Sequence, residues 1–271
     1  MMDGDMDASK TRGIFQGHRV LVVDDLLLNR IVLKGLLSLY DIRPDLACDG
    51  AEALQACSRN TYDLVLTDSH MPVMDGFECA RRLRRDHSLR VKAIVAVTAD
   101  AMAGARERCL DAGMDDVLIK PILREDLERT LSRWLKPVGS DVPPAEAPVP
   151  GPATAIWVDK ARLIKMAEEV GQMKPDFWSD ALVLFRADAG SILKALWEAV
   201  ESENYSETMD RAHALKGICL TLGLVRMAES CKDLQSSATE RNKSVCRSRI
   251  RSLKEDLEPS LSEAHRMLAG I

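Results

Sequence analysis

Four segments of the chain place acidic, hydroxyl and basic side chains where apolar runs end. Asp24 and Asp25 close RVLVVDD, Asp68 closes DLVLTD, Thr98 closes AIVAVT and Lys120 closes VLIK. Short apolar runs rich in β-branched residues predict buried strands. Parallel strands bring their carboxyl ends to the same edge of a sheet, where ligands bind. We therefore expect these five side chains to gather in one crevice.

The expected crevice contains three carboxylates, which repel one another unless a positive group lies among them. Oxygen ligands that are mostly anionic suit a hard divalent ion, and Mg²⁺ is the ion we expect. With that ion and the Lys120 ammonium neutralising a phosphoryl group, Asp68 is a competent nucleophile toward phosphorus. The short Thr98 hydroxyl can donate a hydrogen bond to a phosphoryl oxygen. The predicted chemistry is formation of an aspartyl phosphate.

Each of these segments has a simpler explanation when it is taken alone. Asp24 and Asp25 can be a solvated strand end followed by a helix cap. Thr98 is an ordinary β-branched strand residue, and Lys120 followed by Pro121 is an ordinary end of a strand. Their joint occurrence at matching strand ends, with Asp68 between them, favours a site. A dehalogenase-type phosphatase also uses an aspartate nucleophile, but it requires an Asp-x-Asp pair at one strand end, and no predicted strand ends in one.

Five strand and helix alternations fill the first half of the chain. The predicted strands are 19–25, DLAC, 63–68, 93–98 and 117–120, and the predicted helices lie near 28–40, 50–59, 76–86, 101–112 and 123–136. This alternation predicts a doubly wound α/β domain, in which helices cover both faces of a five-stranded parallel sheet.

Residues 137–156 hold six of the eleven prolines in the chain. Proline fixes φ and lacks a backbone donor, so this segment is predicted to be an extended, semi-rigid spacer that reaches about 60 Å. We place a domain boundary there.

After the linker, strand patterns disappear and apolar residues recur at intervals of three and four. This spacing predicts an all-α domain, a four-helix bundle with one buried face on each helix. The expected helices are 178–200, 205–222, 224–240 and 246–268, preceded by a short helix near 159–170. Pro259 is expected to kink or break the last of them.

The runs VLVVDD, DLVLTDSHMPVMDG, AIVAVTA and VLIKP, in this order and spacing, make residues 18–136 resemble the flavodoxin-like receiver domain of two-component signalling. The resemblance implies that Asp68 is the phosphoacceptor. It also implies that Asp25, Asp68 and the backbone carbonyl of His70 bind Mg²⁺, and that Asp24 acts through water.

The resemblance further implies a cis bond between Lys120 and Pro121, and it shows one departure. Receivers usually carry Tyr or Phe three residues before this lysine, whereas this chain has Val117. The aromatic half of the usual switch is therefore missing. His70 and Asp100 each lie two residues past a site residue, and we expect them to line the path of a hydrolytic water and to tune the lifetime of the phosphate.

A second reactive group lies in the run AHALKGICLTLG, residues 212–223. On a helix, His213 lies roughly 140° from the apolar face and is expected to be exposed. Lys216 and Gly217 follow one turn later on the same side. Glycine inside a helix costs about 1 kcal/mol relative to alanine, so Gly217 predicts that a docking protein comes close there. Taken alone, a surface histidine is usually only solvated, and a helix glycine can serve close packing.

With a receiver-like domain upstream, the H-x-x-K-G pattern makes residues 157–271 similar to a histidine phosphotransfer domain. His213 would be its nucleophile, since a reference pKa near 6.5 leaves much of the ring neutral at pH 7. Lys216 would hold the phosphoryl group. The domain needs no metal of its own, because the docked receiver supplies it.

The predicted function is that of a phosphorelay intermediate. A sensor histidine kinase donates a phosphoryl group to Asp68, which passes it to His213 and then to the receiver of a downstream response regulator. The arrangement resembles the C-terminal part of unorthodox hybrid sensor kinases, and no ATP-binding kinase domain or glycine-rich nucleotide loop is found. Two alternatives stay open: a response regulator whose helical domain binds DNA, and a scaffold that no longer transfers phosphate, which Val117 motivates.

Composition narrows the partners and the compartment. A net charge of −5 gives no general attraction to nucleic acid. The seven cysteines have no metal-binding spacing and are expected to be reduced packing residues. No apolar run approaches the ~18 residues of a membrane span. We expect a disordered segment over 1–17 and a cytoplasmic location, as a separate protein or as the cytoplasmic portion of a membrane-bound kinase.

Overall fold

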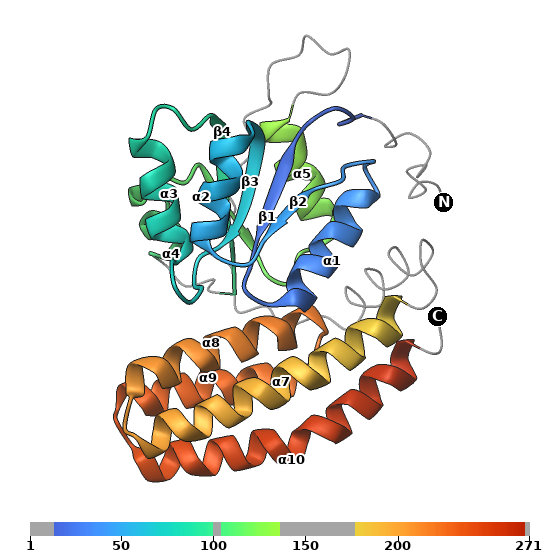
Figure 1. Cartoon of the computed structure of the whole chain (residues 1–271). Coiled ribbons are helices and arrows are strands. Elements are labelled where there is room, and N and C mark those ends of the chain that lie inside the picture. Colours follow the sequence, from blue (N-terminus) through green and yellow to red (C-terminus); the bar gives the residue numbers. More distant parts are fainter. Residues whose placement is uncertain (1–13, 100–103, 136–176, 269–271) are drawn as a thin grey trace.

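The computed structural model describes residues 14–99, 104–135 and 177–268 (Figure 1). The elements of the first domain are β1 (Val20–Val23), α1 (Leu27–Ser38), β2 (Asp45–Ala47), α2 (Gly50–Arg59), β3 (Tyr62–Asp68), α3 (Gly76–Arg85), β4 (Val91–Thr98), α4 (Ala105–Asp111), β5 (Asp116–Ile119) and α5 (Arg124–Trp134). Those of the second are α7 (Phe177–Glu201), α8 (Tyr205–Thr221), α9 (Val225–Thr239) and α10 (Lys243–Leu268). The predicted linker, the predicted leading helix and Asp100 lie outside the described residues.

The first domain is the predicted doubly wound fold, with a parallel sheet in the order β2-β1-β3-β4-β5. Side chains alternate across a strand, and here both faces are covered. Val20 and Val22 of β1 pack toward α1 and α5, whereas Leu21 and Val23 pack toward α2, α3 and α4. The helices on both faces (Figure 1) leave only the sheet edges and strand ends available for a site.

The second domain is the predicted four-helix bundle, in which α7, α8, α9 and α10 pack around one core. Buried apolar residues of α7 recur at the predicted intervals of three and four: Trp178, Ala181, Leu182, Phe185, Ala189, Ile192, Leu193, Leu196 and Val200. Of the two effects predicted for Pro259, a kink or a break, the break does not occur, because α10 continues through it to Leu268. Pro259 is exposed, so the ring meets solvent, and buried Leu261 and Ala264 hold the following turns on the bundle.

Three further observations concern the start of the first domain, the start of α4 and the length of the helices. Phe15 is buried with its ring centroid 6.0 Å from that of Tyr40, so packing in the first domain starts before residue 18. Gly104 has φ 91° and precedes α4, which begins at Ala105, later than the predicted start at 101. No helix in the described parts of the chain is both long enough and apolar enough to cross a membrane.

The two domains are packed against each other. Helices α7 and α8 contact α1, and one apolar cluster runs from the α1 side of the sheet into the bundle core. The bundle lies below the end of the first domain where α1 begins (Figure 1). The same end carries the carboxyl ends of the strands, so the contact covers the predicted crevice.

Candidate functional site

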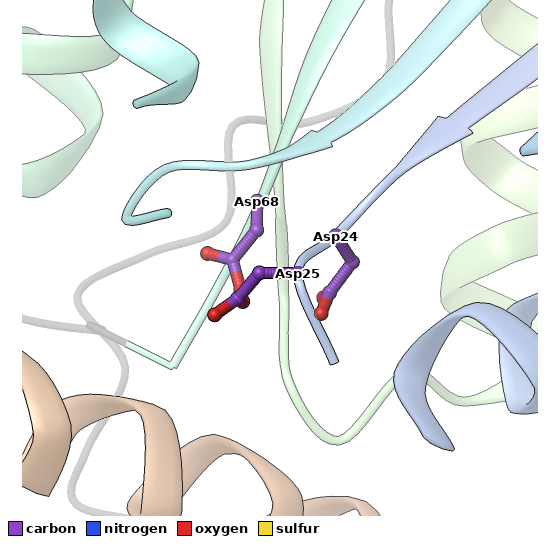
Figure 2. A group of neighbouring side chains, drawn as sticks. All are labelled: Asp24, Asp25 and Asp68. Atoms are coloured by element: carbon purple, nitrogen blue, oxygen red, sulfur yellow. The ribbon is translucent and has the colours of Figure 1, made fainter. Parts of the chain in front are cut away.

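The three aspartates predicted to share a crevice are brought together. Asp24 and Asp25 follow β1, and Asp68 is the last residue of β3. One carboxylate oxygen from each lies within 4.8 Å of the others, and Figure 2 shows the three side chains side by side at these strand ends. Asp24 and Asp68 are buried, while Asp25 is partly exposed. The arrangement is an oxygen-only cluster with one side open.

Lys120 supplies the positive group inside this cluster. Its Nζ donates to Oδ2 of Asp24 at 2.8 Å and to Oδ2 of Asp68 at 2.7 Å. Burial lowers the pKa of Lys120, but the two carboxylates outweigh burial and raise the pKa above its usual value. The Lys120–Pro121 bond is cis, as the resemblance implied. Buried Thr98 ends the neighbouring strand, and its carbonyl accepts from the Lys120 amide at 2.8 Å.

The pKa of the Asp68 carboxyl is lowered, whereas the pKa values of the Asp24 and Asp25 carboxyls are raised. Burial raises the pKa of Asp68, but Lys120 and the His70 amide, which donates at 3.2 Å, outweigh it and lower the pKa. Burial, with the charge of Asp68, raises the pKa of Asp24 to about 6 despite Lys120. Burial and the other two carboxylates raise the pKa of Asp25 to about 7. One ammonium does not balance three acids, and a hard divalent cation would relieve the remaining repulsion.

A close backbone approach fixes the loop after the phosphoacceptor candidate. A Cβ placed on Gly76 would lie 2.1 Å from the carbonyl oxygen of Asp68, which no side chain allows. The Gly76 amide donates to the carbonyl of Ser69 at 3.2 Å, and Asp75 caps α3 by accepting from the Glu78 amide at 2.7 Å. The sequence analysis missed this contact, for which the Asp75-Gly76 pair at the start of the predicted helix near 76–86 is the signal.

Asn29 is a second residue that the sequence analysis missed. Its Nδ2 donates to Oδ1 of Asp24 at 3.0 Å, opposite the Lys120 contact. It lies on α1 among buried residues that are otherwise apolar: Leu28, Val32, Leu33, Leu36 and Leu37. A polar residue within an apolar helix face is the signal that could have identified it.

His213 of α8 lies against the first domain. Its ring centroid is 4.5 Å from that of His70, so the imidazole points out of its own bundle, as predicted, yet is partly buried by the other domain. A Cβ on Gly217 would lie 3.9 Å from Nζ of Lys120. The H-x-x-K-G face, with Lys216 beside the ring, therefore lies on the acidic crevice.

The surroundings of His213 keep its ring neutral. Burial and the neighbouring His70 lower the pKa of His213 to about 4, with Lys216 and Lys120 adding to the effect and Asp68 opposing it. A neutral imidazole has one unprotonated nitrogen, the form that acts as a nucleophile.

Three arginines of α3 and Val117 of β5 lie outside the site. Arg81 and Arg82 pair with Glu78 at 3.3 and 2.7 Å on the surface of α3. Arg84 donates to the carbonyl of Gly113 at 2.8 Å, which connects α3 to the turn between α4 and β5. Val117 is a partly buried β5 residue packed on the core.

Comparisons with known proteins agree with the division of the chain into an α/β domain and a four-helix bundle. The profile of the response regulator receiver domain matches residues 20–132, and that of the Hpt domain matches residues 180–263. The signal transduction histidine-protein kinase BarA of Shigella flexneri is 31% identical over 90% of this chain and 25% of its own length. The sensor histidine kinase AruS of Pseudomonas aeruginosa is 33% identical over 81% of this chain and 21% of its own length. The chain thus spans about a quarter of the length of these relatives.

Among solved structures, the receiver domain of the sensor histidine kinase PA1611 from Pseudomonas aeruginosa, which has magnesium coordinated in its active site cleft, is 40% identical. The match covers 44% of this chain and 97% of that one, with a TM-score of 0.41.

The chain combines a receiver domain and an Hpt domain, the two domains that define the phosphorelay class of two-component proteins. Within that class, it corresponds to the receiver and Hpt region of hybrid sensor kinases. The helical domain is an Hpt domain and not the DNA-binding output domain considered as an alternative.

Proposed function

We propose that Asp68 and His213 hold the same phosphoryl group in turn. The observation that carries this proposal is the contact between the two domains, where the His213 ring lies on His70 and Gly217 lies beside Lys120. A phosphoryl group on Asp68 would be next to a neutral imidazole, with an ammonium at its side. Reacting groups held in this way meet the positional requirement of a transfer step.

The first transfer loads the receiver domain. A carboxylate oxygen of Asp68 attacks the phosphorus of a kinase phosphohistidine, an O–P bond forms, and the N–P bond breaks with its electron pair returning to the kinase imidazole. Lys120 keeps the Asp68 carboxylate ionised for this attack, since it lowers the pKa of that group.

The second transfer moves the group to the bundle. The unprotonated ring nitrogen of His213 attacks phosphorus, an N–P bond forms, and the O–P bond breaks with its electron pair returning to the Asp68 carboxylate. The proton on the other ring nitrogen stays on the product and then exchanges with solvent. The same geometry serves the reverse reaction.

The remaining site residues hold ligands in place. Asp25, Asp68 and the backbone carbonyl of His70 would bind Mg²⁺, with Asp24 acting through water, and the ion when bound neutralises charge on the phosphoryl oxygens. Lys120 and the Thr98 hydroxyl would contact those oxygens in the receiver.

In the bundle, Lys216 would contact the phosphoryl oxygens once the group is on His213. The His70 side chain limits access of water to Asp68 and so tunes the lifetime of the phosphate.

The partners follow from the direction of transfer. A sensor histidine kinase supplies the phosphoryl group, since the relatives that match this chain are such kinases. The receiver domain of a downstream response regulator takes it from His213. Both exchanges take place on the cytoplasmic side of the membrane.

The test is to follow labelled phosphate on single-residue variants. The protein is incubated with a phosphorylated sensor kinase and Mg²⁺, and acid-labile phosphohistidine is separated from base-labile aspartyl phosphate. The unmutated chain should carry both, His213→Gln only aspartyl phosphate, and Asp68→Asn neither. Label on neither residue of the unmutated chain would overturn the proposal and favour the scaffold.

A further inference from the structure

One hydrogen bond joins the two domains between buried side chains. The Thr221 hydroxyl, at the end of α8, lies 3.1 Å from Oδ1 of Asn29 on α1. The two residues are 8% and 6% exposed, although each belongs to a surface that separated domains would expose to water. Both border a small cavity of about 20 Å³ that Asp24 and Lys120 also line.

The direction of this bond is fixed by what Asn29 does on its other side. Its Nδ2 donates to the Asp24 carboxylate at 3.0 Å, and a carboxylate can only accept. The carbonyl oxygen of Asn29 therefore faces Thr221, whose hydroxyl is the donor. Asp24 in turn accepts from Lys120, which also donates to Asp68. A continuous series of hydrogen bonds thus leads from the bundle to the phosphoacceptor.

Thr221 has a second acceptor inside its own helix. Its hydroxyl also lies 3.1 Å from the carbonyl oxygen of Gly217, the ordinary bond of a helical threonine to the preceding turn. A hydroxyl has one proton, so it donates to Gly217 when the bundle is alone and is available to Asn29 when the domains meet. Breaking the contact leaves no unsatisfied donor, which makes it easily reversible.

We propose that Asn29 and Thr221 form a reversible hydrogen bond that holds the bundle on its own receiver with His213 beside the phosphoacceptor, and that Asn29 connects this contact to Asp24. The expected consequence of this contact, faster transfer, rests on the proposed function. The contact itself does not. Both are positioning residues, since neither touches the reacting atoms.

The test compares Thr221→Val, which keeps the shape and loses the hydroxyl, with Thr221→Ser, which keeps the hydroxyl. Asp68 is loaded with acetyl phosphate, and the appearance of phosphohistidine is timed in the full chain. Thr221→Val should slow transfer by about tenfold, the upper range for one neutral hydrogen bond. Asp68 loading should not slow and the melting temperature should not change, and Thr221→Ser should restore the rate.

Asn29→Ala supplies the matched partner for a double-mutant cycle. It should slow transfer at least as much and also alter Asp68 loading, because Asp24 loses a donor. Adding Thr221→Val to Asn29→Ala should cause no further loss. Independent, additive losses would overturn the proposal, as would equal transfer rates in Thr221→Val and Thr221→Ser.

A measurement of docking separates this inference from the proposed function. Small-angle scattering and amide exchange of α1 and α8 report domain contact without any phosphoryl group. Thr221→Val should increase the radius of gyration and speed exchange at both helices, and Thr221→Ser should not. If the unmutated chain loads Asp68 but never His213, the proposed function fails. The difference between Thr221→Val and Thr221→Ser in scattering and amide exchange still tests the contact between the domains.

Discussion

The acidic crevice of the receiver domain and the H-x-x-K-G face of α8 (the histidine face) lie against each other, and they are built differently. The crevice is complete within the receiver domain, where three strand ends and the close backbone approach at Gly76 hold Asp24, Asp68 and Lys120 in contact. The histidine face is one turn of α8, and most of what surrounds His213 comes from the other domain. The nucleophile that we propose with a metal ion needs rigidly placed ligands, whereas the histidine that we propose to serve two partners must stay accessible on one side.

Removal of the metal should separate the two halves most strongly. EDTA is expected to reduce Asp68 loading by acetyl phosphate about a thousandfold, because the ion contributes several kcal/mol of charge neutralisation. Phosphohistidine already formed on His213 should persist in EDTA, since the one group of potential metal ligands among the described residues, Asp24, Asp25 and Asp68, lies in the receiver domain. Mass spectrometry of the intact protein before and after EDTA measures both. Loading that continues in EDTA would contradict the assignment of the crevice.

Gly76→Ala should damage the crevice alone. The added Cβ would lie 2.1 Å from the Asp68 carbonyl oxygen, so the loop must move. We expect a loss of about 3 kcal/mol in stability or site geometry, the upper range for overpacking, and about a hundredfold slower Asp68 loading. Gly190→Ala on α7 is the control, because its Cβ meets nothing within 4 Å and alanine favours a helix. Equal loading rates for the two variants would show that the close approach is unimportant.

A large side chain at Gly217 should damage only the meeting of the two halves. A Cβ added at Gly217 would lie 3.9 Å from Nζ of Lys120, so alanine fits there and leucine does not. Gly217→Leu is expected to slow transfer from Asp68 to His213 by about ten- to hundredfold, the cost of 1 to 3 kcal/mol for overpacking. Asp68 loading should not slow, since the displaced bundle no longer covers the crevice. The two rates are read from one time course, and normal transfer in Gly217→Leu would place the reactive contact elsewhere.

The effect of pH on the free energy of docking between the two domains should be smaller than the effects of metal removal and of these substitutions. His213 has a pKa of about 4 in the docked chain, against 6.5 for an unperturbed imidazole, because burial and His70 disfavour the charged ring. Docking therefore favours the neutral ring, so this contribution is complete above pH 6.5 and is lost as the pH falls from 6.5 toward 4. At pH 5 the loss is about 2 kcal/mol.

An NMR titration of the His213 ring in the full chain tests this dependence. The docked ring should titrate near 4 and that of Gly217→Leu near 6.5. Equal pKa values in the two proteins would contradict the docked environment.

The sequence predicted the crevice better than it predicted the contact between domains. Strand ends of a parallel sheet meet by topology, so Asp24, Asp68 and Lys120 could be placed together from the alternation of strands and helices alone. The roles of Asn29 and Gly76 depend on backbone and side-chain distances that no periodicity encodes. The same is true of Pro259, whose effect depends on whether its ring meets solvent or the core.

The docked arrangement could be predicted only in part. A glycine one turn after His213 indicated a close approach, but it did not indicate which surface approaches. That choice depends on Thr221, Asn29 and the apolar residues around them, on two segments far apart in the chain.

The central claim is that one chain passes a phosphoryl group between its own two domains, and the dependence of the transfer rate on protein concentration tests it most directly. After Asp68 is loaded and free acetyl phosphate is removed, the rate constant for appearance of phosphohistidine should stay the same across about a hundredfold dilution, as for a tethered reaction. A mixture of Asp68→Asn and His213→Gln chains should transfer only in proportion to concentration. If the unmutated chain slows in the same proportion on dilution, transfer takes place between molecules and the account is contradicted.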